Sequence, residues 1–167
     1  MSSERNGGSP ASVSSDLFRR ACGRFATGIS IATVLDPVGE PHGLTVSSFT
    51  SVSLEPPLIL ICLGHAVSCI EIFRAASHFG INVLGEDQRP LSEHFARKGH
   101  DRFGSLEWRR GETGVPLLPD VLAVMECALK RRVTAGDHDI FIGEMVHAHV
   151  REGAPLVHYA SRYRRLG

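Results

Sequence analysis

Six short hydroxyl side chains lie within nine consecutive residues of this sequence. They are Thr45, Ser47, Ser48, Thr50, Ser51 and Ser53. Uncharged donors of this kind suit a ligand that presents several hydrogen-bond acceptors in one plane. The apolar run from Leu58 to Leu63 follows directly and would supply contacts for the flat faces of such a ligand. Taken alone, the segment also fits a hydroxyl-rich strand edge that binds no ligand, and such strand edges are the more common case.

A second candidate for chemistry is the pair His147 and His149, which stand two residues apart in an alternating segment. Their rings would point to the same side of one strand, at a spacing that metal sites use. Glu152 is the only further ligand close in sequence, so solvated or interface-facing histidines are the favoured interpretation. A metal-binding β-barrel stays as an alternative.

Several familiar sites are missing from the sequence. It holds no GxGxxG after a strand, no GxxxxGK[ST] and no GxSxG, which argues against a Rossmann nucleotide site, a P-loop and an α/β-hydrolase. Lys plus Arg number 18 and Asp plus Glu number 18, so the formal net charge is zero. This balance attracts neither nucleic acid nor an anionic membrane, and it tolerates self-association.

The four cysteines (Cys22, Cys62, Cys69 and Cys127) form no CxxC pair, which predicts reduced thiols in a cytosol. No targeting signal is visible, and the longest apolar run, residues 58–63, is far shorter than the roughly 20 residues that span a bilayer. A cytoplasmic protein without a membrane segment is therefore predicted.

The pattern of apolar residues predicts a disordered tail over residues 1–14 and one domain over 15–167. Helical spacing favours helices over 15–25, 66–76 and 87–98. Strands are predicted over 29–35, 58–63, 79–84, 106–110, 121–134 and 139–150, with 58–63 buried on both faces. In the last strand we expect Ile140, Ile142, Val146, Ala148 and Val150 on the buried face, and Phe141, Met145 and His147 outward. Strands joined by turns, with a few short helices, indicate a closed or nearly closed barrel rather than a doubly wound sheet.

Four stretches together resemble the short-chain flavin reductase family, the reductase components of two-component flavin-dependent monooxygenases. They read GLTVSSFTSVSLEPPLILICL, SCIEIFRAASHFGINVLGEDQRPLSEHFA, GDHDIFIGEMVHAHV and PLVHYASRYRRL, and they cover roughly residues 16–166. The resemblance implies a mainly β fold with short helices, the FMN-binding split β-barrel. It also implies a homodimer with the flavin sites near the subunit interface.

The resemblance also assigns roles to residues. Those matching the family's cofactor-binding positions are Thr45, Ser47, Ser48, Ser51, Ser53, Cys62, Ser68, Asn82, Val83, Leu84, His94, Phe95, Arg102 and Phe103. Ser68 marks a helix start that would suit phosphate, and Arg102 with Phe103 matches a basic-aromatic pair near the phosphates. His138, within Gly-Asp-His-Asp, matches the nicotinamide-binding turn.

The implied activity is that of an NAD(P)H-dependent flavin reductase, which passes hydride from NADH to FAD or FMN and supplies reduced flavin to a partner monooxygenase. The missing acid–base pairs fit, because the two cofactors supply the reaction chemistry. Asp137 and Asp139 would repel the extra phosphate of NADPH, so NADH is the expected donor. The stretch CLGHAVSCI departs from the family pattern and leaves the choice between FAD and FMN open. A non-catalytic flavin-binding or carrier protein on the same barrel is the alternative.

Overall fold

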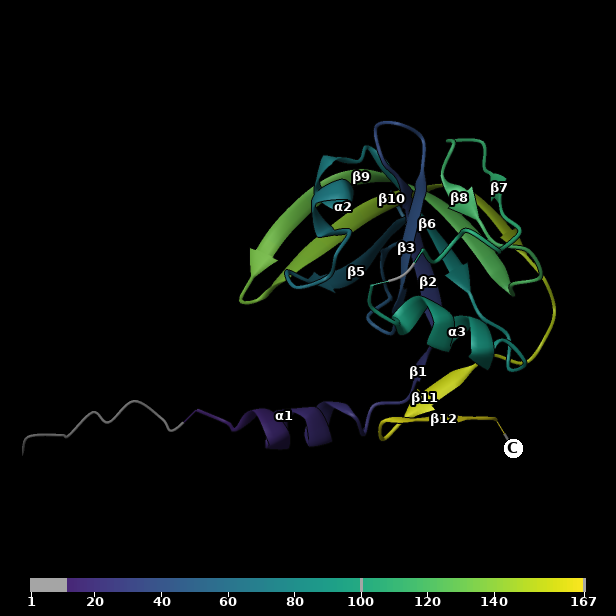
Figure 1. The fold of residues 1–167 in the computed structure, drawn as a ribbon. Coiled ribbons are helices and arrows are strands. Elements are labelled where there is room, and N and C mark those ends of the chain that lie inside the picture. Colours follow the sequence, from purple (N-terminus) through teal and green to yellow (C-terminus); the bar gives the residue numbers. More distant parts are fainter. Residues whose placement is uncertain (1–11, 100, 167) are drawn as a thin grey trace, which may run out of the picture.

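The computed structural model describes residues 12–99 and 101–166, so the predicted tail over 1–14 lies outside it except for 12–14, which form no helix or strand. The main sheet has seven strands in the order β3-β2-β6-β9-β10-β5-β4, and Figure 1 shows how they curl around one interior. All neighbouring strands in this sheet are antiparallel. Its strands are β2 (Ser30–Leu35), β3 (Pro41–Val46), β4 (Thr50–Ser53), β5 (Leu58–Gly64), β6 (His78–Val83), β9 (Ala123–Ala135) and β10 (His138–Val150).

Two small sheets and three helices complete the fold. The small sheets contain β1 (Thr27–Gly28), β11 (Val157–Tyr159) and β12 (Arg162–Arg164) in one, and β7 (Arg109–Arg110) and β8 (Pro116–Leu117) in the other. The helices are α1 (Ser15–Cys22), α2 (Ile70–Ala75) and α3 (Arg89–Ala96), each shorter than predicted. No helix among the described residues is long and apolar enough to cross a bilayer.

The main sheet curls into a barrel that stays open between its two edge strands. These edges, β3 and β4, are consecutive in the chain and joined by residues 47–49, and β3 also lies beside β5. The Ser48 hydroxyl donates to the Cys62 carbonyl and accepts from the Cys62 amide, both at 2.9 Å. The Ser48 side chain therefore links the β3–β4 connection to β5 at a point before β4 begins. The prediction of a nearly closed barrel is confirmed.

The long hairpin of β9 and β10 forms the back of the barrel. Helix propensity competes with strand in residues 121–134, yet this segment is strand from Ala123 to Ala135, as predicted. It pairs with β6 on one side and β10 on the other, so its backbone groups are satisfied by neighbouring strands. Tertiary pairing outweighs the modest helix propensity of its Ala, Met, Glu and Leu residues.

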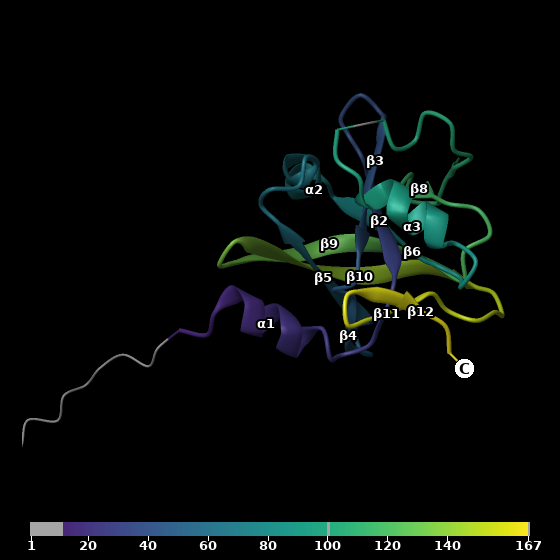
Figure 2. The same cartoon turned by 60° about the horizontal axis from the view of Figure 1, so that its bottom comes forward.

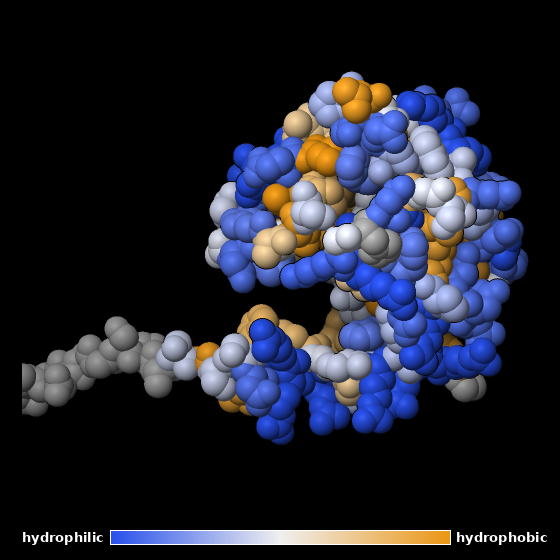
Figure 3. Space-filling view, in the orientation of Figure 1, coloured by the Kyte–Doolittle hydropathy of each residue, from blue (hydrophilic) through white to orange (hydrophobic). Residues whose placement is uncertain are grey.

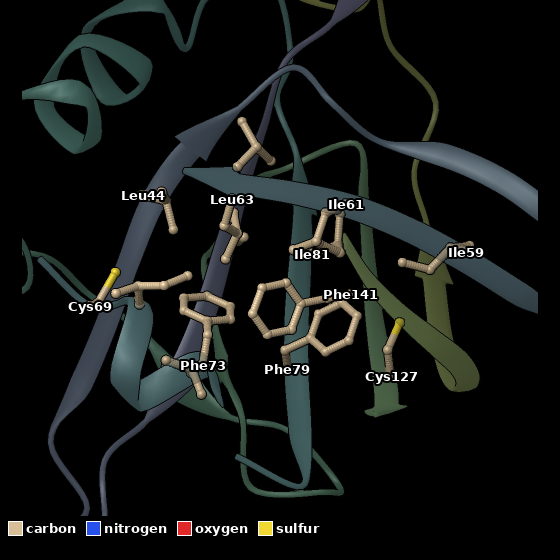
Figure 4. Close-up of a cluster of buried hydrophobic side chains, with 14 residues drawn as sticks. Leu44, Ile59, Ile61, Leu63, Cys69, Phe73, Phe79, Ile81, Cys127 and Phe141 are labelled. Atoms are coloured by element: carbon tan, nitrogen blue, oxygen red, sulfur yellow. The ribbon is translucent and has the colours of Figure 1, made fainter. Parts of the chain in front are cut away.

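Aromatic rings fill the inside of the barrel (Figure 4). Phe73, Phe79 and Phe141 are each at most 2% exposed, and the rings of Phe73 and Phe141 meet edge to face with centroids 6.0 Å apart. A second cluster, which includes Phe95 and Phe103, lies under α3, where these two rings meet edge to face at 5.1 Å. Helices α2 and α3 lie on one side of the β9–β10 hairpin, and α1 with the β11–β12 hairpin lies on the other (Figure 2).

The predicted orientation of β10 is wrong. Phe141 is fully buried, whereas Ile140 and Ile142 lie half-buried on the outer face. Gly143 explains the choice of face, because a Cβ there would come within 2.6 Å of the Phe79 ring. The inner face therefore needs a residue without a side chain, and the bulky Ile residues take the opposite face. The outward position predicted for His147 is correct.

Strand β5 also differs from its prediction, because only one of its faces is buried. Ile59, Ile61 and Leu63 point inside, and Leu60 and Cys62 alternate with them on the half-buried outer face. In register, these outer residues pair with Ile142 and Ile140 of β10. The two strands thus present a small apolar surface on the outside of the barrel.

Helix α1 projects from the barrel instead of packing into the core as its pattern suggested. None of its residues is buried, and the side chains of Leu17, Phe18 and Phe25 are 54%, 61% and 77% exposed. Figure 3 shows apolar atoms on the side of α1 that faces the gap between this helix and the barrel. The chain after α1 is held by the β11–β12 hairpin, where the Ala160 amide donates to the Gly23 carbonyl at 2.8 Å.

Candidate functional site

A cavity of about 230 Å³ lies between β3, the end of α3 and the loop after β5. Four of the residues singled out in the sequence line it: Thr45, Ser68, Phe95 and Arg102. A second hollow of about 310 Å³ shares Ser68 and Arg102 with it and adds Phe103. The two hollows adjoin, and we call them together the β3 groove.

Two hydroxyls of the 45–53 segment are already used inside the protein. Thr45 donates to the Ser92 carbonyl in α3 at 2.6 Å, and Ser48 bridges to Cys62 as described above. These side chains hold the walls of the site, and only their remaining lone pairs could serve a ligand. Burial raises the pKa of the Cys62 thiol, so this group stays a neutral contact and not a nucleophile.

The other hydroxyls of the segment are placed differently. Ser47, Ser51 and Ser53 make no side-chain hydrogen bond within the part of the chain that the structure describes. Ser47 lines a further cavity of about 270 Å³ together with Val83 and Phe25. Ser51 and Ser53 belong to the edge strand β4, where Ser51 is exposed and Ser53 half-buried. The predicted hydroxyl side chains are therefore divided between the β3 groove, the separate cavity beside Ser47 and the edge of the sheet.

Arg102 and Lys98 bring positive charge to the first hollow of the β3 groove, while Glu40 and Asp101 line the second. The Arg102 guanidinium donates to the Gly43 carbonyl at 2.8 Å and to the Arg97 carbonyl at 3.1 and 2.8 Å. Within the described residues, neither Arg102 nor the neighbouring Lys98 forms an ion pair. The carboxylate of the nearby Asp101 accepts hydrogen bonds from the backbone amides of residues 103 and 104. A positive charge that is held by neutral carbonyls remains available to an anion such as a phosphate.

The side chain of Asn82 lies in the interior and is not available to a ligand. Its amide nitrogen donates to the Ile31 carbonyl at 3.1 Å and to the Thr33 hydroxyl at 3.3 Å, and its oxygen accepts from the Leu118 amide at 2.8 Å. Leu84 is fully buried as well. Of the side chains at this strand end, only that of Val83 therefore reaches a cavity, and Asn82 and Leu84 could offer a ligand no more than backbone atoms.

Phe95, Phe103 and His94 support the groove from below. The two phenylalanines are 0% and 5% exposed and belong to the core. His94 Nε2 lies 2.8 Å from the Arg102 carbonyl, which fixes the loop carrying the guanidinium. Of these residues, Phe95 and Phe103 reach the lining of the groove.

The Gly-Asp-His-Asp turn joins β9 to β10 at the far end of the long hairpin. His138 Nδ1 lies 2.7 Å from the Asp137 carboxylate, a hydrogen bond that lowers the pKa of Asp137. The His138 ring lies over Gly64, where an added Cβ would be 3.4 Å from Nε2. The His65 amide donates to the Asp137 carbonyl at 2.9 Å. Because residues 66–68 line the β3 groove, one loop adjoins both the turn and the groove.

The burial of two carboxylates was not predicted from the sequence, where Asp139 was expected to face a nucleotide. Asp139 is fully buried and Glu126 is 4% exposed. Glu126 accepts from the amides of Glu112 and Thr113 at 3.0 and 2.7 Å, which fixes the loop between β7 and β8. Arg74, a partner of Asp139, lies 65 residues away in the chain. The only signal in the sequence was an acidic residue in an inward register, which becomes readable once the inner face is known.

The described residues contain no group of three or more His, Cys, Asp and Glu side chains that could hold a metal ion. His147 and His149 are both exposed on the outer half of β10, and Glu126 stands opposite His147 in the register. The favoured interpretation of these histidines as solvated or interface residues fits this placement.

Residues 22–167 match the model of the flavin reductase like domain. The chain belongs to the flavin reductase-like family. An FMN reductase (NADH), SmoA of Agrobacterium fabrum, is 44% identical over 147 residues, which are 88% of this chain and 83% of that protein. A reductase component of a 4-nitrophenol monooxygenase from Rhodococcus opacus is 38% identical over 146 residues, covering 87% and 78%.

A solved member of the flavin reductase family supports the fold. The NADH:FAD oxidoreductase of Streptomyces globisporus, in complex with NAD and FAD fragments, superimposes with a TM-score of 0.84 at 38% identity, over 91% of this chain and 92% of that one. The split β-barrel predicted from the resemblance is thereby confirmed. Some relatives are longer: this chain spans 41% of a Rhizobium meliloti protein to which it is 46% identical over 127 residues.

Proposed function

We propose that this protein is an NADH-dependent flavin reductase that transfers hydride from NADH to FAD or FMN. The observation that carries the proposal is the loop after β5, which contacts the Gly-Asp-His-Asp turn through His65 and lines, through residues 66–68, the hollow that holds Arg102 and Lys98. Membership of the flavin reductase-like family supports it, as do the relatives named for NADH and for FMN or FAD.

The residues of the groove fit a flavin. Arg102 and Lys98 supply positive charge for its phosphate, and the apolar cavity beside Ser47 and Val83 suits a flat ring. Flavin supplies the chemistry of hydride acceptance when it is bound. The protein itself contributes placement, because Thr45 and Ser48 fix the groove walls through hydrogen bonds to α3 and β5.

His138 would bind the nicotinamide donor in this arrangement. Its ring is held by Asp137 and half exposed, so it can stack or hydrogen-bond without taking part in proton transfer. Asp137, which is 94% exposed, is the carboxylate that would repel the extra phosphate of NADPH, because Asp139 is buried against cations. Arg132 reaches toward the same turn but is paired with Asp139 at 3.3 Å.

The direct test is an absorbance assay of NADH oxidation by the purified protein, with and without added FAD or FMN. Flavin-dependent turnover is expected with both flavins, and the ratio of their kcat/KM values gives the preference. Absence of turnover with either flavin, at flavin concentrations where binding is measured by fluorescence, would refute the enzyme function and favour a flavin carrier.

A partner oxygenase and a second copy of the chain complete the proposal. Relatives named as reductase components of monooxygenases support an oxygenase that accepts the reduced flavin. The exposed apolar residues of α1 and the outer apolar surface of β5 and β10 support a homodimer, because such surfaces are stabilised by burial. Light scattering at micromolar concentration tests the dimer, and a monomer mass with full activity would contradict it.

A further inference from the structure

The buried carboxylate of Asp139 holds four partners at the base of the Gly-Asp-His-Asp turn. Its Oδ2 accepts from Arg74 Nε at 2.7 Å and from Arg132 at 3.3 Å. Its Oδ1 accepts from the Thr134 hydroxyl at 2.8 Å and lies 3.1 Å from His65 Nε2. The Asp139 side chain is 0% exposed, whereas its partners Arg74, His65 and Arg132 are partly exposed.

These partners come from three different parts of the fold. Thr134 and Arg132 belong to β9, Arg74 to the last turn of α2, and His65 to the loop after β5. Two bonds hold the His65 end of that loop to the turn, one from its imidazole to Asp139 and one from its amide to the Asp137 carbonyl at 2.9 Å. The same loop continues into residues 66–68, which line the β3 groove.

We infer that Asp139, acting through His65, is a positioning residue for nicotinamide binding. It fixes the distance and orientation between the turn that carries His138 and the loop that forms a wall of the flavin groove. This inference rests on the proposed function, because it concerns how the donor is presented to the flavin. Asp139 itself cannot touch either ligand, since it is fully buried.

The contact from His65 is the part of the cluster that can be broken without dismantling the core. Its side chain is 34% exposed, whereas Asp139 is needed by two arginines. Replacing His65 by Leu removes the hydrogen bond to the carboxylate at similar bulk. Replacing it by Gln retains an N–H donor that can reach the same oxygen. Glu71→Gln serves as the matched control, because Glu71 is 77% exposed and pairs with Arg74 at 2.6 Å without touching Asp139.

The experiment measures steady-state kinetics with NADH at saturating flavin for the full chain and the three variants. Loss of one hydrogen bond that orients a binding residue is expected to raise the KM for NADH about two- to tenfold in His65→Leu, with kcat within about twofold. His65→Gln and Glu71→Gln should stay within about twofold of the wild-type KM.

Each result decides the inference. An unchanged KM in His65→Leu overturns it, because the link then affects only folding. An equal rise in His65→Gln also overturns it, because the imidazole would then act on the nucleotide directly. Asp139→Asn gives an independent check, with the same rise in KM expected if the variant folds by circular dichroism. A wild-type protein without NADH oxidation would instead refute the proposed function, so the two failures are distinguishable.

Discussion

Replacing Ser48 by Ala tests whether one hydroxyl holds the open side of the barrel together. The side chain makes two hydrogen bonds of 2.9 Å to the backbone of Cys62, on the β4 side of β5 and beyond the last residue that pairs with β4. Each such bond contributes about 0.5–1.5 kcal/mol, so the free energy of unfolding is expected to fall by about 1–3 kcal/mol. At about 2–4 °C per kcal/mol for a chain of this size, the melting temperature should fall by about 2–12 °C.

Urea unfolding followed by the fluorescence of Trp108 measures this loss at one fixed protein concentration. Trp108 is the single tryptophan and meets Phe103 edge to face at 6.1 Å, so its emission reports on the core beneath α3. Ser51→Ala is the matched control, because Ser51 is an exposed hydroxyl of the same segment without a hydrogen-bond partner in the described chain. It should change the free energy of unfolding by less than about 0.5 kcal/mol.

Two results would refute this reasoning. If Ser48→Ala unfolds at the wild-type urea concentration, the bridge to Cys62 contributes nothing to stability. If Ser51→Ala loses as much as Ser48→Ala, the effect belongs to the segment in general and not to the bridge. A fluorescence titration with FMN on the same proteins separates the roles further, because Ser51→Ala is expected to weaken flavin binding several-fold while leaving stability intact.

Three further changes have defined outcomes. His138→Ala should raise the KM for NADH in steady-state kinetics and leave flavin affinity nearly unchanged. The reason is that a residue that binds the ground and transition states alike affects KM more than kcat. Lost flavin binding with an unchanged KM would place His138 in the flavin site. Phe18→Glu should shift the dimer toward monomer in light scattering, because Phe18 is 61% exposed on α1, while Val38→Glu, which alters an 83% exposed valine on the β2–β3 turn, should not. The Arg74 hydrogen bond holds the pKa of Asp139 below its ordinary value of 3.8, so the stability that this carboxylate contributes is present above pH 3.8 and is lost as the pH falls further toward the lowered pKa. The difference in melting temperature between wild type and Asp139→Asn should therefore be constant near neutral pH and shrink in acid; a difference that grows in acid would contradict this sign.

The central strands of the main sheet were predictable from sequence, whereas its two edge strands, β3 and β4, and the faces of the strands were not. Turn residues and alternation located β9 and β10, since Gly136 and Asp137 form a turn between two segments of strand length. The alternation in β10 assigned Ile140 and Ile142 to the core, because they form its more regular apolar set. The buried face of β10 is instead set by Phe79, which lies on another strand and needs the space that Gly143 leaves. Only the packed barrel contains that information.

The candidate site shows the same limit. Resemblance placed Arg102 in the binding region, and the structure puts it at the groove without an ion pair among the described residues. Resemblance could not say that the Asn82 side chain is consumed by three internal hydrogen bonds. Nor could it show that Asp139 is buried, because its cationic partners come from α2 and β9 and meet it only in the folded chain. Contacts between residues distant in sequence decide which polar side chains remain for a ligand.

The hydroxyl-rich segment has a physical reason to exist even before a ligand binds. A split barrel must carry its chain from one edge strand to the other across an opening, where strand pairing cannot satisfy the backbone. Short hydroxyls can donate and accept close to the main chain: Thr45 donates to α3, and Ser48 both donates to and accepts from β5. Long or charged side chains would have obstructed the same opening. The opening thus stays accessible and held in shape, so the residues that build the barrel edge also prepare the place where a flat cofactor can enter.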